Sequence, residues 1–485
     1  MQSHKFSTHL AFSLFTLAVM LALVLPNLVQ HGMFMDGTQY AIVAKNLWEG
    51  KGSFWFPYLS SSWEKQGQNY FLEHPPLIYF LESFFFKICN GSYLSERLYC
   101  FFTFILSAFL IKAIWQRIFK KENKYHLLYW LPVLLWIIVP SVSWSYKNNM
   151  QENTVSVFVL ASVYFMLRSI SKDSNTYLFI ILAGTSIFLA SFSKGLPGLF
   201  PLSFFIIMRL AFKNITWKQV ISNTFLLALI PAAIYFLMVY FNDDARRSLS
   251  FYVNERLFHR ISNDPEVESR FTVLFWLFSD LLVPMVILLP FMGFNMMRNK
   301  KSMLSLQDPI LKKHILLFAG IGLAGVIPLC LTHVQRAVYF VPALPFFAIM
   351  LSVLFLDEIF KLQNNVTLSP KAFKTVFTVG SVGVIAVLIY TIIVFGKDGR
   401  DEEVISDARK IAVVTGKNKN IYALSGIYEE WGFQFYLLRY NNITLEPGAK
   451  QQEYILLNKE EKFADATYKD LNLDLTKYKL LKKIN

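Results

Sequence analysis

The sequence contains few charged residues for its length. Only 16% of its 485 residues are Asp, Glu, Lys or Arg, whereas 54% are hydrophobic. The mean hydropathy is +0.41, so the chain has more apolar surface than a single soluble core could bury. The shortage of charge therefore excludes an ordinary soluble globular protein and predicts a polytopic membrane protein.

Cysteine and acidic residues are also scarce. The three cysteines, Cys89, Cys100 and Cys330, lie in or beside apolar segments with no paired spacing, so the sequence implies neither a disulfide framework nor a zinc site. Acidic residues number 33 against 47 basic ones, giving a formal net charge of +14. The Lys and Arg residues are spread over short loops between apolar runs, as the positive-inside rule expects. We therefore predict contact with membrane lipids and no nucleic-acid partner.

Apolar runs long enough to cross a hydrocarbon core of about 30 Å occupy most of the chain. The first, Leu10–Leu28, follows the basic residue Lys5, and no small-residue cleavage site precedes Asp36. We expect it to be a permanent span, since a cleaved signal peptide would need such a site. Eleven spans are predicted, at about 10–29, 98–116, 127–146, 153–168, 176–193, 196–212, 219–241, 271–297, 314–331, 336–356 and 373–395.

One further apolar run, Pro75 to Cys89, is too short to be a span and carries Glu82 and Lys87. It is typical of an amphipathic helix that lies in the membrane interface. With this helix flat, the basic clusters at 112–124, 298–313 and 361–374 all fall on the cytoplasmic side, as the positive-inside rule requires. The N-terminus is then cytoplasmic, and the long loops and the C-terminal tail lie outside.

The tail differs in composition from the rest of the chain. Residues 1–395 form the predicted membrane domain, whereas residues 396–485 are charged and alternate in polarity. The runs 420–426, 443–447 and 453–458 are typical of strands, and helical periodicity appears between 428 and 440. We expect a small extracytoplasmic α/β domain that acts as a lid or a docking surface.

Four polar motifs converge on the predicted outer face. Asp36 begins the first, DGTQYAIVAKNL, and His74 lies in the second, FLEHPPLIYF. Glu152, in NNMQENTVSVFVL, begins a span, and Lys194, in ASFSKGLPGLFPL, separates two apolar runs. Ionisable residues at a membrane boundary are candidates for a functional site, because an ion there stays hydrated and still faces the bilayer.

Each motif also has a purely structural interpretation. Asp36 would serve as the N-cap of an interfacial helix through Ala41 to Trp48, and Lys194 would stabilise a helix C-terminus. His74 beside two prolines would be a turn residue, and Tyr40 would be an interfacial anchor. The sequence alone leaves these alternatives open.

The motifs, taken in order and followed by QRAVYFVPALP at 335–345, resemble the bacterial glycosyltransferase family 39 group. Its members are related to dolichyl-phosphate-mannose protein mannosyltransferases and to lipid A aminoarabinose transferases. The resemblance covers roughly residues 10–395 and implies the GT-C fold, an all-α polytopic membrane protein with about 11 spans and interfacial helices. Two positions depart from the family. Many members have Asp-Glu where this chain has Asp36-Gly37, and Glu152 stands where Asp is common.

The resemblance implies an inverting sugar transfer from a polyprenyl-phosphate donor to a lipid, protein or glycan acceptor, outside the bacterial cytoplasmic membrane. It implies that Asp36 orients and deprotonates the acceptor, and that Glu152 orients the donor or a cation. Tyr40 is a further candidate for substrate binding. A divalent cation is left open as a cofactor. The candidates for holding the donor phosphate are His74, Lys194, Arg256, Arg260 and Arg336.

The alternative function is a polyprenyl-linked sugar flippase or another transporter, which would also be polytopic and basic. Transporters of this kind have helices broken by Gly or Pro, with polar residues near the middle of the membrane. Here the polar candidates gather at the outer boundary, which favours the transferase.

Overall fold

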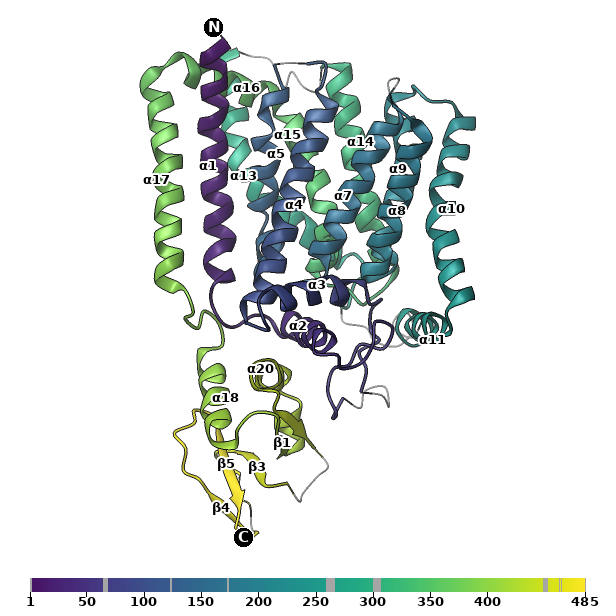
Figure 1. The fold of residues 1–485 in the computed structure, drawn as a ribbon. Helices are drawn as coiled ribbons and strands as arrows, with labels where there is room; N and C mark the ends of the chain where they lie inside the picture. The colour runs from purple at the N-terminus through teal and green to yellow at the C-terminus, as the bar shows by residue number, and fades with distance from the viewer. Residues whose placement is uncertain are drawn as a thin grey trace.

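The protein is described by a computed structural model that covers residues 2–63, 69–122, 124–171, 174–258, 267–299, 307–447, 452–461, 463 and 465–484. A helical bundle carries a small sheet domain at one end, and the N-terminus lies at the opposite end (Figure 1). The helices up to the second interfacial segment are α1 (Gln2–Leu28), α2 (Met35–Trp48), α3 (Leu77–Ile88), α4 (Leu94–Ile118), η1 (His126–Leu128), α5 (Trp130–Ile137), α6 (Pro140–Lys147), α7 (Glu152–Ser169), α8 (Thr176–Lys194), η2 (Leu196–Ser203), α9 (Phe204–Phe212), α10 (Trp217–Phe241), α11 (Asp243–Phe251) and η3 (Tyr252–Phe258).

The small domain follows the bundle along the chain, and the second half of the bundle has fewer membrane-spanning helices than the first. Its helices are α13 (Thr272–Asn299), α14 (Pro309–Val326), η5 (Ile327–Leu331), η6 (Ala337–Ala343), α15 (Leu344–Leu354), α16 (Leu356–Leu368) and α17 (Pro370–Val394). The small domain consists of α18 (Glu402–Thr415), β1 (Asn420–Ala423), α19 (Ser425–Tyr428), α20 (Trp431–Asn441), β2 (Thr444–Glu446), β3 (Tyr454–Asn458), β4 (Tyr468–Asp470) and β5 (Tyr478–Lys483).

Most of the predicted spans correspond to helices that are long and apolar enough to cross a membrane. In the described part of the chain, eight helical segments are long and apolar enough to cross a membrane. A ninth arises if His126–Ile137 and Pro140–Lys147 are counted together. The two remaining predicted spans are helical as well, at Glu152–Ser169 and Leu196–Phe212, and α7 and α9 stand among the other helices of the bundle (Figure 1). The predicted all-α polytopic fold is confirmed.

The run 127–146 is not the single straight span that we predicted. Its two helical halves, His126–Ile137 and Pro140–Lys147, meet at an angle of 77°. Pro140 is the first residue of α6, and Val139 before it has extended dihedral angles, φ −64° and ψ 125°. Proline disfavours the α conformation in the preceding residue, which breaks the helix at this point. After the bend, α6 contributes side chains to the cavity of the candidate site.

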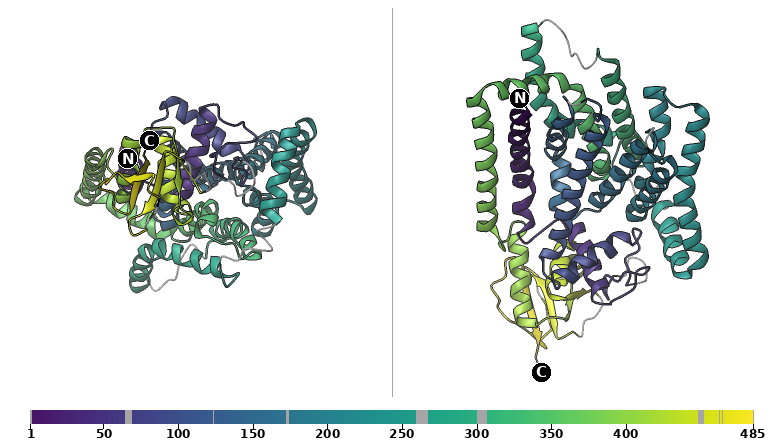
Figure 2. Two further views of the ribbon diagram at one scale, coloured as in Figure 1. Left: turned by 90° about the horizontal axis from the view of Figure 1, so that it is seen from below. Right: turned by 45° about the horizontal axis from the view of Figure 1, so that its top comes forward.

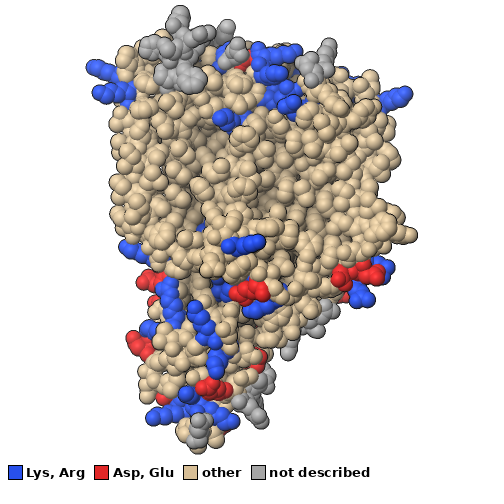
Figure 3. Space-filling view, in the orientation of Figure 1, with Lys and Arg blue, Asp and Glu red and all other residues tan. Residues whose placement is uncertain are grey.

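The helices α2 and α3 lie across one end of the bundle, and most of the spans stand upright above them (Figure 1). The predicted interfacial helix over Pro75 to Cys89 corresponds to α3. Lys, Arg, Asp and Glu appear at both ends of the molecule, with a broad band of other residues between them (Figure 3). This band is the surface that a bilayer would cover, since it exposes apolar side chains such as Phe109, Ile221 and Ile392.

The small domain contains one five-stranded sheet with the order β2-β1-β3-β5-β4. Strand β1 pairs in parallel with β2 and β3, and β5 pairs antiparallel with β3 and β4. The predicted strands correspond to β1, β2 and β3, and the predicted helix to α20. The sequence did not predict β4, β5 or α18. Seen from below, the domain lies under the side of the bundle near α17 and leaves the side of α10 uncovered (Figure 2).

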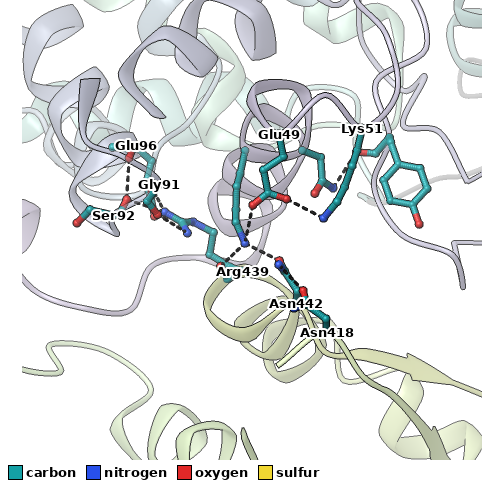
Figure 4. Close-up of polar contacts among 12 residues, drawn as sticks. Glu49, Lys51, Gly91, Ser92, Glu96, Asn418, Arg439 and Asn442 are labelled. Carbon is teal, nitrogen blue, oxygen red and sulfur yellow. Dashed lines mark hydrogen bonds and ion pairs between the residues drawn. The ribbon is translucent and has the colours of Figure 1, made fainter. Parts of the chain in front are cut away.

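Helix α20 attaches this domain to the interfacial layer. Arg439 makes a two-pronged ion pair with Glu96 at the start of α4, at 2.7 and 3.2 Å, and both side chains are almost completely buried. Lys45 of α2 donates to the Arg439 carbonyl at 3.2 Å and to Asn442 at 2.5 Å (Figure 4). The removal of one partner from a buried pair leaves an uncompensated charge, so Arg439 and Glu96 hold α20 against the start of α4, and the Lys45 contacts join it to α2.

The parity of the spans predicts which end of the bundle faces outward. In a background without Cys89 and Cys330, a cysteine at Lys417 in the small domain should react with an impermeant maleimide added to intact cells. A cysteine at Lys121, exposed at the opposite end, should react only after the cells are opened. Labelling of Lys121→Cys from outside, or protection of Lys417→Cys, would show that the predicted orientation is wrong.

Candidate active site at the interfacial end of the bundle

A cavity of about 750 Å³ lies where the bundle, the interfacial helix α2 and the small domain meet. Five of the eight predicted site residues line it, and they come from distant parts of the chain. They are Asp36, Tyr40, His74, Lys194 and Arg336.

Asp36 lies in the first turn of α2, at the edge of the cavity. It is not the N-cap, because α2 begins at Met35 and Phe34 takes the cap position without a side-chain hydrogen bond. The Asp36 carboxylate lies 3.6 Å from Nη1 of Arg336, and the two side chains are 23% and 43% exposed. An ion pair that water reaches is weak, so little free energy is lost when Arg336 separates from Asp36.

Glu152 and Lys194 form a buried ion pair beside the cavity. Glu152 begins α7 and Lys194 ends α8, and the Lys194 Nζ lies 2.5 Å from the Glu152 carboxylate, with the side chains 1% and 8% exposed. The Lys194 ammonium is also 5.1 Å from the centre of the Tyr339 ring. Lys194 lines the cavity, whereas Glu152 is not among the lining residues. Glu152 is therefore placed to fix the position of Lys194.

Tyr40 and His74 form part of the cavity wall. Their rings lie 6.2 Å apart in an edge-to-face arrangement. Tyr40 is only 5% exposed, so it is buried at the site instead of anchoring the helix at the interface. Burial, together with the nearby Asp36, raises the pKa of Tyr40 well above its ordinary value. Tyr40 therefore stays a neutral hydroxyl at physiological pH.

Two predicted residues cannot be placed. The side chain of Arg256 and the whole of Arg260 lie outside the described residues. Within the described ranges, no three His, Cys, Asp or Glu side chains come together as a metal site.

The sequence missed the aromatic residues that complete the cavity. Trp431 and Phe435 of the small domain line it, together with Trp63 of the loop after α2 and Trp144 of α6. Trp63 and Trp431 are in edge-to-face contact, with ring centres 5.5 Å apart. No sequence signal marks these residues, because helical periodicity in α20 does not reveal what the helix packs against.

Three comparisons with known proteins bear on this geometry. A family model described as dolichyl-phosphate-mannose-protein mannosyltransferase matches residues 73–242. The crystal structure of ArnT from Cupriavidus metallidurans bound to undecaprenyl phosphate is similar over 96% of this chain and 97% of ArnT, with a TM-score of 0.66 and 12% identity. ArnT in the apo state gives a TM-score of 0.63 over 96% of this chain and 95% of ArnT, also at 12% identity. No curated protein matches the sequence.

The chain has the GT-C glycosyltransferase fold. The resemblance predicted from the order of the motifs is therefore confirmed, and the protein is a multi-pass membrane protein with this fold. The match with ArnT also extends over nearly the whole chain, although the sequence resemblance ended near residue 395.

The departure at Gly37 has a structural reason within this fold. The first turn of α2 packs against the turn that follows α6, where Asn148 accepts from the backbone N–H of Phe34 at 2.8 Å. Asn149 donates to the Gly37 carbonyl at 3.2 Å. A Cβ at position 37 would lie 1.9 Å from the Asn148 carbonyl oxygen. A second carboxylate therefore does not fit after Asp36 unless α2 moves.

We expect Gly37→Ala to destabilise the protein and to displace Asp36. The new methyl group meets backbone atoms, and overpacking of this kind costs about 1–3 kcal/mol. The melting temperature in detergent should fall, and turnover should fall with it. Gly426→Ala is the control, since nothing lies within 4 Å of its Cβ position, and it should change neither. Wild-type stability and turnover in Gly37→Ala would contradict the close packing of α2.

Proposed function

We propose that this protein transfers a sugar from a polyprenyl-phosphate donor to a lipid, protein or glycan acceptor, with inversion, on the outer face of the bacterial cytoplasmic membrane. The observation that carries the proposal is the convergence of the Asp36 carboxylate with the cations Lys194 and Arg336 on one cavity at the end of the bundle, which a second acid, Glu73, and a third cation, Lys147, also line. We also propose residues 1–395 and 396–485 as the two domains.

In this proposal Asp36 accepts the proton of an acceptor hydroxyl while the acceptor oxygen attacks the anomeric carbon of the donor sugar. The bond from that carbon to the phosphate oxygen breaks, and the lipid phosphate leaves with the bonding electrons. Because phosphate is a good leaving group, no proton donor is needed. A positioned base contributes about 10²- to 10⁴-fold in rate, and Lys194 and Arg336 would stabilise the charge that develops on the phosphate.

The ion pairs at the site suggest an order of events. Arg336 lies beside Asp36, and a carboxylate beside a cation is a poor base because the cation favours its ionised form. A donor phosphate would compete for Arg336 and leave Asp36 available for the acceptor. Lys194 is held by Glu152, so it would meet the phosphate as a fixed cation. Tyr40, His74, Arg256 and Arg260 are proposed as further substrate-binding residues.

The role of the base is tested with Asp36→Asn. The amide has nearly the same shape but does not accept the proton, so turnover should fall by about 100-fold or more with an unchanged melting temperature. Purified protein is incubated with radiolabelled polyprenyl-phosphate sugars and a membrane extract. The matched control is Asp243→Asn, since Asp243 is 72% exposed in α11. A folded Asp36→Asn protein with more than about a tenth of wild-type turnover would exclude Asp36 as the base.

The role of the cations is tested by donor binding. A ligand that prefers the folded state raises the melting temperature by mass action, so a short-chain polyprenyl phosphate should stabilise the wild-type protein. Lys194→Gln and Arg336→Gln should each reduce this shift, because a desolvated charge pair weakens strongly when one partner is lost. Lys374→Gln, at the exposed start of α17, should not. An unchanged shift in both site variants would remove these residues from the phosphate site.

A further inference from the structure

A second pocket lies at the opposite end of the bundle, far from the candidate active site. It has a volume of about 370 Å³ and is formed between α4 and α7 where these two helices end. Four of its lining residues are cations: Lys112, Arg117 and Lys120 of the α4 segment, and Arg168 of α7. In the part of the chain that the structure describes, no Asp or Glu lines this pocket.

The helix geometry brings these cations together. Lys112 and Gln116 are four residues apart and therefore lie on one face of α4, and Lys120 follows in the turn directly after the helix. Arg168 is in the last turn of α7, which packs against α4. Lys and Arg are common at this end of a membrane protein, but isolated snorkelling side chains spread apart into the headgroup region. Snorkelling therefore does not explain why cations from two helices line one pocket.

Aromatic side chains contact two of the cations. The Lys112 ammonium lies 4.3 Å from the centre of the Tyr129 ring. The Arg168 guanidinium lies 4.7 Å from the centre of the Phe179 ring and donates to the Tyr164 hydroxyl at 3.3 Å. Cation–π contacts hold a charge in place without neutralising it. Lys112 and Arg168 thus keep their positive charges at the pocket, and cations held at close range favour an anion because like charges repel one another.

The pocket has a polar side and an apolar side. Phe109 lies one helical turn before Lys112, lines the pocket and is 61% exposed. It belongs to the band of apolar side chains that a bilayer would cover. An anion bound by the cations would therefore have hydrocarbon directly beneath it, which is the arrangement of a lipid headgroup and its acyl chains. Lys and Arg gather at this upper end of the molecule, around the end of α4 (Figure 3).

We propose that this pocket binds the phosphate headgroup of an anionic glycerophospholipid from the leaflet at the N-terminal end of the bundle. The cations contact the headgroup, and the acyl chains lie along α4 past Phe109. Basic pockets between membrane helices on the cytoplasmic side are the kind of site that binds such headgroups. The site is independent of the proposed reaction, since it lies at the other end of the spans.

The test uses the full-length protein, purified and melted in mixed micelles that contain either phosphatidylglycerol or phosphatidylcholine with the same acyl chains. Phosphatidylglycerol should raise the wild-type melting temperature more than phosphatidylcholine. Lys112→Gln with Lys120→Gln should lower the affinity for phosphatidylglycerol by roughly tenfold or more, since each cation near an anionic lipid contributes several-fold. This pair leaves Arg168 and its contacts intact, so melting in phosphatidylcholine serves as the check of folding.

A matched control separates a pocket from a general surface charge. Lys371→Gln with Lys374→Gln removes the same charge from exposed positions at the same end of the bundle and should keep the wild-type response to phosphatidylglycerol. An equal loss of response in both double variants, or no loss in either, would overturn the proposal. Soluble glycerophosphate is the third arm, and stabilisation by it as large as that by the lipid would overturn the assignment to a membrane lipid.

Discussion

The position of helix α2 is the constraint on which the candidate site depends, because α2 carries Asp36. On the side of the bundle, the turn after α6 approaches so closely that position 37 has no room for a side chain. On the other side, Lys45 donates to the end of α20 in the small domain. A helix held between two bodies in this way has a fixed first turn, so the carboxylate faces the cavity in one orientation.

The small domain is part of the site and does not merely cover it. The buried pair between Arg439 and Glu96 ties α20 to the start of α4, and the same helix places Trp431 and Phe435 in the cavity wall. A buried ion pair is weak as a source of net stability, but it disfavours every arrangement in which one charge is left alone. Its effect here is to define one docked arrangement, and that arrangement brings the aromatic side chains to the cavity.

The charges of the molecule follow the physics of a membrane. Most of the spans have few ionisable groups, while cations and acids gather at the two ends (Figure 3). At one end they include carboxylates and cations, which line a large cavity together with aromatic rings. At the other end the pocket between α4 and α7 is lined by cations without an acid among its described residues. The two ends thus suit different ligands, although both face the same kind of interface.

The sequence by itself determined the helical part of the fold, because crossing a bilayer requires long apolar runs with internally bonded backbones, and such runs are visible locally. It also indicated Asp36, Tyr40, His74, Lys194 and Arg336 through the order of short motifs. Only the tertiary structure decided which of these groups meet. Lys194 pairs with Glu152, 42 residues away, and Lys45 contacts Arg439, 394 residues away. Contacts at such separations leave no periodic trace in the chain, which is also why the bend at Pro140 and the part that Trp431 plays in the cavity came from the structure alone.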